Sequence, residues 1–228
     1  MRKLTINIYD IASWLYHELL QNDIQFNDEG YPIFKPEFIL WQKPNYIIPF
    51  NHRNAAPKKS ETVLCFFMND KLLYKRLANL KNDLKLFSGY LGICGFDLSP
   101  RMGWDEDLQK FNILLSQMAT VWLALHGIKI IPNFRTGCYS TLSSLSVYPK
   151  NLPVAIGALG CWKKKLSLKE ILYFKLKLFL MNPVFICIYG LLEDEILDEI
   201  QDSGIDFKSF SDFRTICRNK EKTENVRC

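Results

Sequence analysis

Short apolar runs alternate with amphipathic stretches through most of the 228-residue chain. Apolar, β-branched and aromatic residues fill six short runs, at 63–67, 90–96, 128–132, 154–157, 184–189 and 205–210. Between most of them, apolar positions recur with helical spacing, over 71–86, 104–126, 166–181 and 193–203. Near-continuous apolar strands separated by helices are typical of a parallel sheet covered on both faces. The pattern therefore predicts an α/β fold with a parallel sheet of about five or six strands and flanking helices, either an open sheet or an incomplete barrel.

The first sixty residues follow a different pattern. Residues 11–20 have the spacing of an amphipathic helix, and five prolines then alternate with aromatic residues between 31 and 58. Frequent proline prevents a long helix and confines strands to sheet edges. We therefore predict an N-terminal helix and wrapping segment over 1–60, an α/β domain over 61–212 and a frayed tail over 213–228.

Local signals support these helix boundaries. Gly127 and Gly204 directly follow helical stretches, and each suits a C-terminal cap. Ser167 and Glu170 have the spacing of a capping box at the start of the helix over 166–181.

The composition excludes several classes of protein. With 48% hydrophobic and 23% charged residues, the chain is neither wholly disordered nor fibrous. Its net charge of +5 is too small to indicate a nucleic-acid-binding protein by itself. The seven cysteines include no C-x-x-C pair, which argues against a disulfide framework or a zinc site and favours a reducing, cytoplasmic compartment. Polar residues interrupt the N-terminus and residues 171–192, so we expect neither a signal peptide nor a membrane span.

Polar residues and glycines follow each predicted strand, where parallel α/β proteins bind their ligands. The candidates at these strand ends are Asp97, Ser99, Asn133, Arg135, Gly157, Gly160, Cys161, Tyr189 and Gly190. They predict one pocket, with Asp97 and Ser99 as its catalytic candidates and the others as ligand-binding residues. Asp97 would act as a general acid–base or accept a hydrogen bond from a hydroxyl group.

Two roles are open for Arg135. Its planar guanidinium suits a carboxylate or phosphate group, but it could equally form a structural ion pair with Asp97 across adjacent strand ends. The 157–161 loop precedes a capped helix and three lysines, so its backbone amides could bind an anion. It matches neither the Walker A motif nor the dinucleotide fingerprint, and the cofactor, if any, is unknown.

Four segments together resemble the bacterial and phage family of the domain of unknown function 4417. They are GFDLSPRMGWDEDLQKFN, WLALHGIKIIPNFRTG, VAIGALGC and FICIYG, and the similarity covers about residues 62–210. The resemblance implies a phage or mobile-element context without an established activity, and it supports a site at the strand ends. The chain departs from the family pattern at Met68-Asn69-Asp70, where an aromatic residue and an acid are expected, and at Leu115, where a basic residue is expected. These departures leave open whether this member is active, and whether the chain is an enzyme at all.

Three functions follow from these observations. The leading hypothesis is a strand-end pocket for a phosphorylated, nucleotide-like ligand. The first alternative is a non-enzymatic interaction protein, such as an inhibitor of a host defence component, that uses the proline–aromatic segment 31–50 to contact a host or phage protein. The second alternative is nucleic-acid binding through residues 163–177 and 214–227, which the seven acids within 193–206 disfavour.

Overall fold

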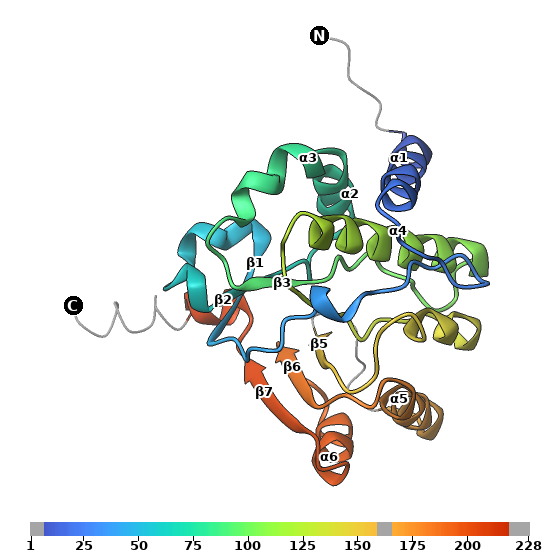
Figure 1. Ribbon diagram of the computed structural model, residues 1–228. Helices are drawn as coiled ribbons and strands as arrows, with labels where there is room; N and C mark the ends of the chain where they lie inside the picture. Colours follow the sequence, from blue (N-terminus) through green and yellow to red (C-terminus); the bar gives the residue numbers. More distant parts are fainter. Residues whose placement is uncertain (1–6, 159–165, 219–228) are drawn as a thin grey trace.

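The computed structural model describes residues 7–158 and 166–218 (Figure 1). Its strands are β1 (Tyr46–Pro49), β2 (Thr62–Cys65), β3 (Gly92–Cys94), β4 (Ile130–Ile131), β5 (Pro153–Gly157), β6 (Phe185–Tyr189) and β7 (Asp206–Phe210). Its α-helices are α1 (Ile8–Gln21), α2 (Asp70–Ala78), α3 (Leu80–Asp83), α4 (Glu106–Leu125), α5 (Leu168–Met181) and α6 (Asp194–Asp202). Short 3-10 helices lie at Pro36–Phe38, Phe50–Ala55, Lys59–Glu61, Leu84–Phe87 and Tyr139–Leu145.

The α/β class with parallel pairing is confirmed, but the strands form two sheets rather than one. The first sheet has the order β1-β2-β3-β4 and the second has the order β5-β6-β7, with every neighbouring pair parallel. A parallel bridge between Asn133 and Ala155 connects them, with hydrogen bonds from Ala155 N to Pro132 O (2.8 Å) and from Phe134 N to Ala155 O (2.9 Å). Pro132 has no N–H group to donate, so the ladder cannot extend through it.

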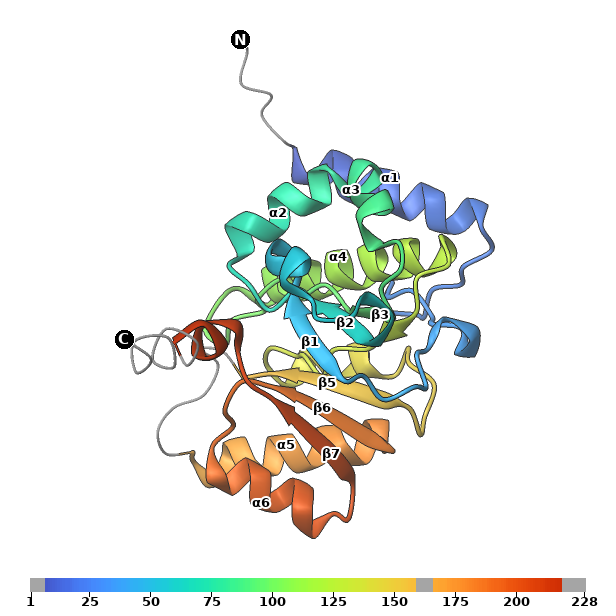
Figure 2. The same ribbon diagram turned by 90° about the vertical axis from the view of Figure 1, so that its left-hand side faces the viewer.

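Side chains alternate between the two faces of each sheet, which gives the fold its layers. Val63, Cys65, Cys94, Ala155 and Cys187 belong to a core that both sheets share. The alternate positions of the first sheet pack against α1, α2 and α4, and those of the second sheet pack against α5 and α6. Figure 2 shows the two groups of helices on opposite sides of the strands. The molecule is therefore an open α/β structure in which two sheets face each other across one core.

The outer edges of the two sheets meet through side chains. The Lys43 ammonium forms an ion pair with Asp206, and Lys208 Nζ donates a hydrogen bond to Pro44 O at 3.1 Å. Within the described ranges, no strand pairing joins β1 to β7. The strands thus follow their sequence order around the core without closing into a barrel.

The N-terminal segment contributes more to the fold than its pattern predicts. Its residues 46–49 form β1, an edge strand of the first sheet, where Pro49 is tolerated because its nitrogen is not needed for pairing on the outer side. Tyr31, Phe34 and Phe38 are buried in the protein's own core, whereas Trp41 and Tyr46 remain 54% and 38% exposed. The segment is therefore packed for much of its length.

An aromatic cluster lies between the first sheet and its helices. Phe66, directly after β2, is fully buried and stacks on Phe96 with ring centroids 4.1 Å apart. Phe50 lies on another side of Phe66 at 5.4 Å, and Phe87 lies at 6.2 Å. The cluster therefore packs the segments that follow β1, β2 and β3 against one another.

The predicted helix ends are confirmed. Gly127 follows α4 with φ of +83° and Gly204 follows α6 with φ of +69°, a conformation that glycine adopts without strain. Ser167 and Glu170 form a complete capping box on α5. Along the described ranges, we find no helix with the length and apolar character that a membrane crossing requires.

Candidate functional site

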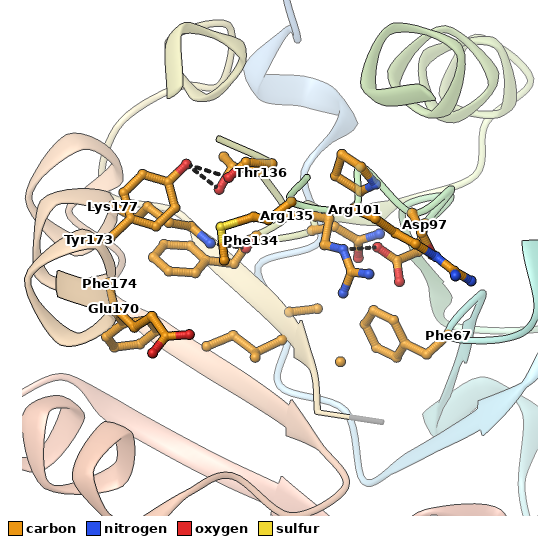
Figure 3. A pocket seen from close by; sticks show the side chains of 18 residues that line it. Phe67, Asp97, Arg101, Phe134, Arg135, Thr136, Glu170, Tyr173, Phe174 and Lys177 are labelled. Carbon is orange, nitrogen blue, oxygen red and sulfur yellow. Dashed lines mark hydrogen bonds and ion pairs between the residues drawn. The ribbon is translucent and has the colours of Figure 1, made fainter. Parts of the chain in front are cut away.

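A cavity of about 560 Å³ lies at the carboxyl ends of β3, β4 and β5 (Figure 3). The residues after β3 and β4 form one side, and α5 forms the other. Of the candidates, the structure places Asp97, Ser99, Asn133, Arg135 and Gly157 around this cavity. The volume is in the range of pockets that hold a small organic ligand.

Asp97 and Arg135 meet at the centre of the site. Arg135 Nε lies 3.6 Å from Asp97 Oδ1, and the Arg135 side chain remains 27% exposed towards the cavity. Burial raises the pKa of the Asp97 carboxyl group above its ordinary value, although the charges of Arg135 and Lys177 act in the opposite direction. Arg135 is thus an ion-pair partner that still presents part of its surface to the cavity.

Buried polar side chains on α4 hold the loop after β3 in place. Thr120 Oγ1 accepts a hydrogen bond from Phe96 N, Ser116 Oγ accepts one from Leu98 N, and Asn112 Nδ2 donates to Ser99 O. Gln109, one turn earlier, accepts from Cys138 N after β4. Gln109, Asn112 and Ser116 recur along one face of α4, and all three are buried because their side chains satisfy the backbone of the loops that line the site.

Asp70 fixes Ser99. The Asp70 carboxylate accepts hydrogen bonds from both the backbone N and the hydroxyl of Ser99, each at 3.0 Å. The Ser99 hydroxyl is therefore oriented towards the first turn of α2. Through these two bonds, Ser99 positions the loop between Asp97 and Arg101.

Helix α5 supplies site residues that the strand-end argument missed: Glu170, Tyr173, Phe174 and Lys177. Lys177 is buried, donates a hydrogen bond to Phe134 O at 2.7 Å and lies 4.4 Å from the Phe134 ring centre. Its position in the sequence could have identified Lys177 as a site residue, because it lies on the same helix face as the core residues Phe174, Leu178 and Met181. A lysine on the buried face of a helix needs a polar partner, and here the site provides one.

The charges around the cavity favour an anion. Arg101, Arg135 and Lys177 line it together with two acidic side chains, Asp97 and Glu170. Glu170 also accepts hydrogen bonds from the N and Oγ atoms of Ser167. Arg101 is exposed beside the Trp104 ring, with 5.0 Å between its guanidinium carbon and the ring centre.

Of the predicted glycine loop, the structure describes Gly157 and Ala158. Gly157 borders the cavity, and a Cβ atom there would lie 2.4 Å from Phe67 Cδ1, so its lack of a side chain accommodates the Phe67 ring. Gly160 and Cys161 lie outside the described residues.

Tyr189 and Gly190 lie apart from the cavity lining. Tyr189 is buried in the shared core, and its hydroxyl accepts a hydrogen bond from Phe213 N at 2.9 Å. Gly190 N donates to Phe210 O with φ of +97°. Tyr189 is the last residue of β6 and Gly190 follows it, and both contact the end of β7 or the chain after it.

The burial of Asp97 predicts a pH-dependent contribution to stability. A folded-state pKa above the unfolded value of 3.8 means that the folded protein binds this proton more tightly, so stability falls as the pH rises through the folded pKa. We expect the difference in unfolding free energy between the wild type and Asp97→Asn to shift against the wild type from about pH 4 to about pH 7. Urea denaturation of both proteins across this range measures it, and a difference that grows in favour of the wild type would contradict it.

Comparison with known proteins identifies a family to which this chain is similar. The family model described as Domain of unknown function (DUF4417) matches residues 30–210, which includes β1 and the complete cavity lining. No curated protein and no solved structure gives a significant match.

Proposed function

The chain belongs to the DUF4417 family, and we propose that the strand-end cavity binds a phosphorylated, nucleotide-like small molecule. The observation that carries this proposal is the convergence of Arg101, Arg135 and Lys177 on one cavity of ligand size. Arginine forks and a lysine ammonium are well suited to phosphate oxygens.

Aromatic side chains support the nucleotide-like part of the proposal. Phe67, Phe134, Tyr173 and Phe174 line the same cavity as the basic residues. Flat apolar surfaces of this kind can stack on a nucleobase, while the basic side chains hold a phosphate. A ligand with both features would use both parts of the lining.

A catalytic role would rest on Asp97. Burial raises its pKa, so the carboxyl group holds a proton at a higher pH than an exposed aspartate does, as a general acid–base requires. The Ser99 hydroxyl donates to Asp70, which makes Ser99 better suited to positioning the loop than to nucleophilic attack.

A thermal-shift screen of nucleotides and sugar phosphates tests the proposal, with wild type and Arg135→Lys compared. Ligand at about 100 times its Kd should stabilise the wild type by about 2.7 kcal/mol, a rise in Tm of roughly 5–10 °C. Lysine keeps the charge but loses the planar fork, so Arg135→Lys should keep a near-normal Tm without ligand and lose most of the ligand-induced rise.

Arg76→Lys is the matched control. Arg76 also pairs with a buried aspartate, Asp83, at 3.1 Å, and it lies outside the cavity lining. This variant should keep the full ligand-induced rise in Tm. The proposal fails if no phosphorylated compound stabilises the wild type, or if Arg135→Lys responds to ligand as the wild type does.

The two alternatives have less support. Tyr31, Phe34 and Phe38 of the proline–aromatic segment pack into the core, so an interaction surface would draw instead on exposed apolar residues of α5: Leu168, Leu172, Leu176, Phe179 and Leu180.

Nucleic-acid binding is disfavoured because Lys175 is paired with Glu199 at 2.9 Å and Lys177 is buried in the site. Lysines 163–165 lie outside the described residues.

A further inference from the structure

A second, much smaller recess lies behind the cavity. Its volume is about 20 Å³, which is enough for one water molecule or one small polar group. Asp97, Asn133 and Arg135 line both the cavity and the recess, so the recess adjoins the cavity. Gln117 and Tyr148 line the recess but not the cavity.

Three of the residues that line the recess carry a buried hydrogen-bond acceptor that has no donor. Asp97 Oδ1, Asn133 Oδ1 and Gln117 Oε1 are all buried and have no hydrogen-bond partner among the described residues. The three residues are only 8%, 6% and 4% exposed. Leaving such an atom unsatisfied destabilises the folded protein, so three beside one recess require an explanation.

The donor atoms of these side chains are already used. Asn133 Nδ2 donates to Gly95 O (2.6 Å) and Phe96 O (2.8 Å), and Gln117 Nε2 donates to Ser144 O (2.8 Å). These hydrogen bonds orient both side-chain amides. If the oxygen and nitrogen of either amide exchanged places, the hydrogen bonds that its nitrogen donates would be lost. Arg135 Nε, 3.6 Å from Asp97 Oδ1, is beyond normal hydrogen-bonding distance in this arrangement.

We propose that the recess is a specificity subsite for an amino group carried by the phosphorylated ligand. This inference rests on the proposed function and names the ligand class more closely: a phosphorylated compound with an exocyclic or sugar-bound amino group. An amino group supplies at least two N–H donors to the three acceptors. An oxo group at the same position would place an acceptor against acceptors and leave all of them unsatisfied.

Pairs of ligands that differ at one position test this directly. The pairs are adenosine and inosine 5′-monophosphate, cytidine and uridine 5′-monophosphate, and glucosamine and glucose 6-phosphate. We expect isothermal titration calorimetry with the wild-type protein to give at least tenfold tighter binding of the amino member in at least one pair. The comparison uses the wild type alone, so it does not depend on whether a variant folds.

Variants then separate the recess from the phosphate site. Gln117→Met removes one acceptor at similar volume, and Asp97→Asn replaces a carboxylate oxygen with a donor; each should reduce the preference for the amino member by about tenfold. Arg101→Ala, on the exposed side of the cavity, should weaken both members of a pair equally and leave the preference unchanged.

Each outcome has a distinct meaning. A preference for the amino member that is lost in the two recess variants supports the inference. Phosphorylated ligands that bind with equal affinity within a pair, or better in the oxo or hydroxyl form, would overturn the amino subsite and leave the proposed phosphate pocket intact. The recess would then hold only water. Absence of binding by every compound would overturn the proposed function and the subsite with it.

Discussion

Replacing Phe66 with alanine is expected to destabilise the protein by about 3–5 kcal/mol, the cost of removing a fully buried aromatic ring from a well-packed core. Phe66 contacts Phe50, Phe87 and Phe96, which belong to three separate connections of the first sheet. These rings cannot all move into the space that it leaves. For a chain of this length the loss corresponds to a fall in Tm of roughly 6–20 °C, which differential scanning calorimetry measures.

Phe179→Ala is the control for this prediction. Phe179 lies on the outer face of α5 and is 80% exposed, so truncation to alanine should change the unfolding free energy by no more than about 0.5 kcal/mol. Equal effects of the two substitutions would show that Phe66 does not have the buried environment described above.

Asn133→Leu is expected to cost about 2–5 kcal/mol. The side-chain amide of Asn133 donates to the carbonyl groups of both Gly95 and Phe96, and leucine would leave both carbonyls buried without a donor. Asn133 also lies at the backbone bridge between the two sheets, whose hydrogen bonds are made by its neighbours Pro132 and Phe134 with Ala155. Chemical denaturation of the variant measures the free energy.

Asn79→Ala provides a matched comparison. Its side chain also donates to a backbone carbonyl, that of Lys75, but it does so at the surface, where water can replace it. We therefore expect a loss below about 1 kcal/mol. If Asn133→Leu costs no more than Asn79→Ala, the role of the Asn133 amide in satisfying the Gly95 and Phe96 carbonyls is wrong.

Much of the fold follows from local pattern. The apolar runs at β2 to β6 are too hydrophobic to lie on a surface, and the amphipathic stretches between them have helical spacing. β1 was missed because Pro44 comes two residues before it and Pro49 ends it, which suppresses the strand signal. The division into two sheets was missed because it depends on how strands pair around Pro132, and pairing is a tertiary property.

The site was predictable where topology alone brings residues together. Asp97 and Arg135 lie at the ends of neighbouring parallel strands, so their contact follows from strand order. Lys177 and Tyr173 reach the cavity from a helix, and their approach depends on how α5 packs on the second sheet. Tyr189 was assigned to the ligand, but side-chain alternation along β6 places it with Cys187 in the shared core.

The order of the strands has a consequence for how the chain folds during synthesis. Among the strands that the structure describes, each pairing within a sheet joins strands that are consecutive along the chain, so the sheets can assemble in the order in which they leave the ribosome. The ion pair between Lys43 and Asp206 joins positions 163 residues apart, so this seam can form only at the end. Until β5 to β7 emerge, the inner face of the first sheet, with Val63, Cys65 and Cys94, has nothing to cover it. The nascent chain is therefore most prone to aggregate in the interval between its two sheets.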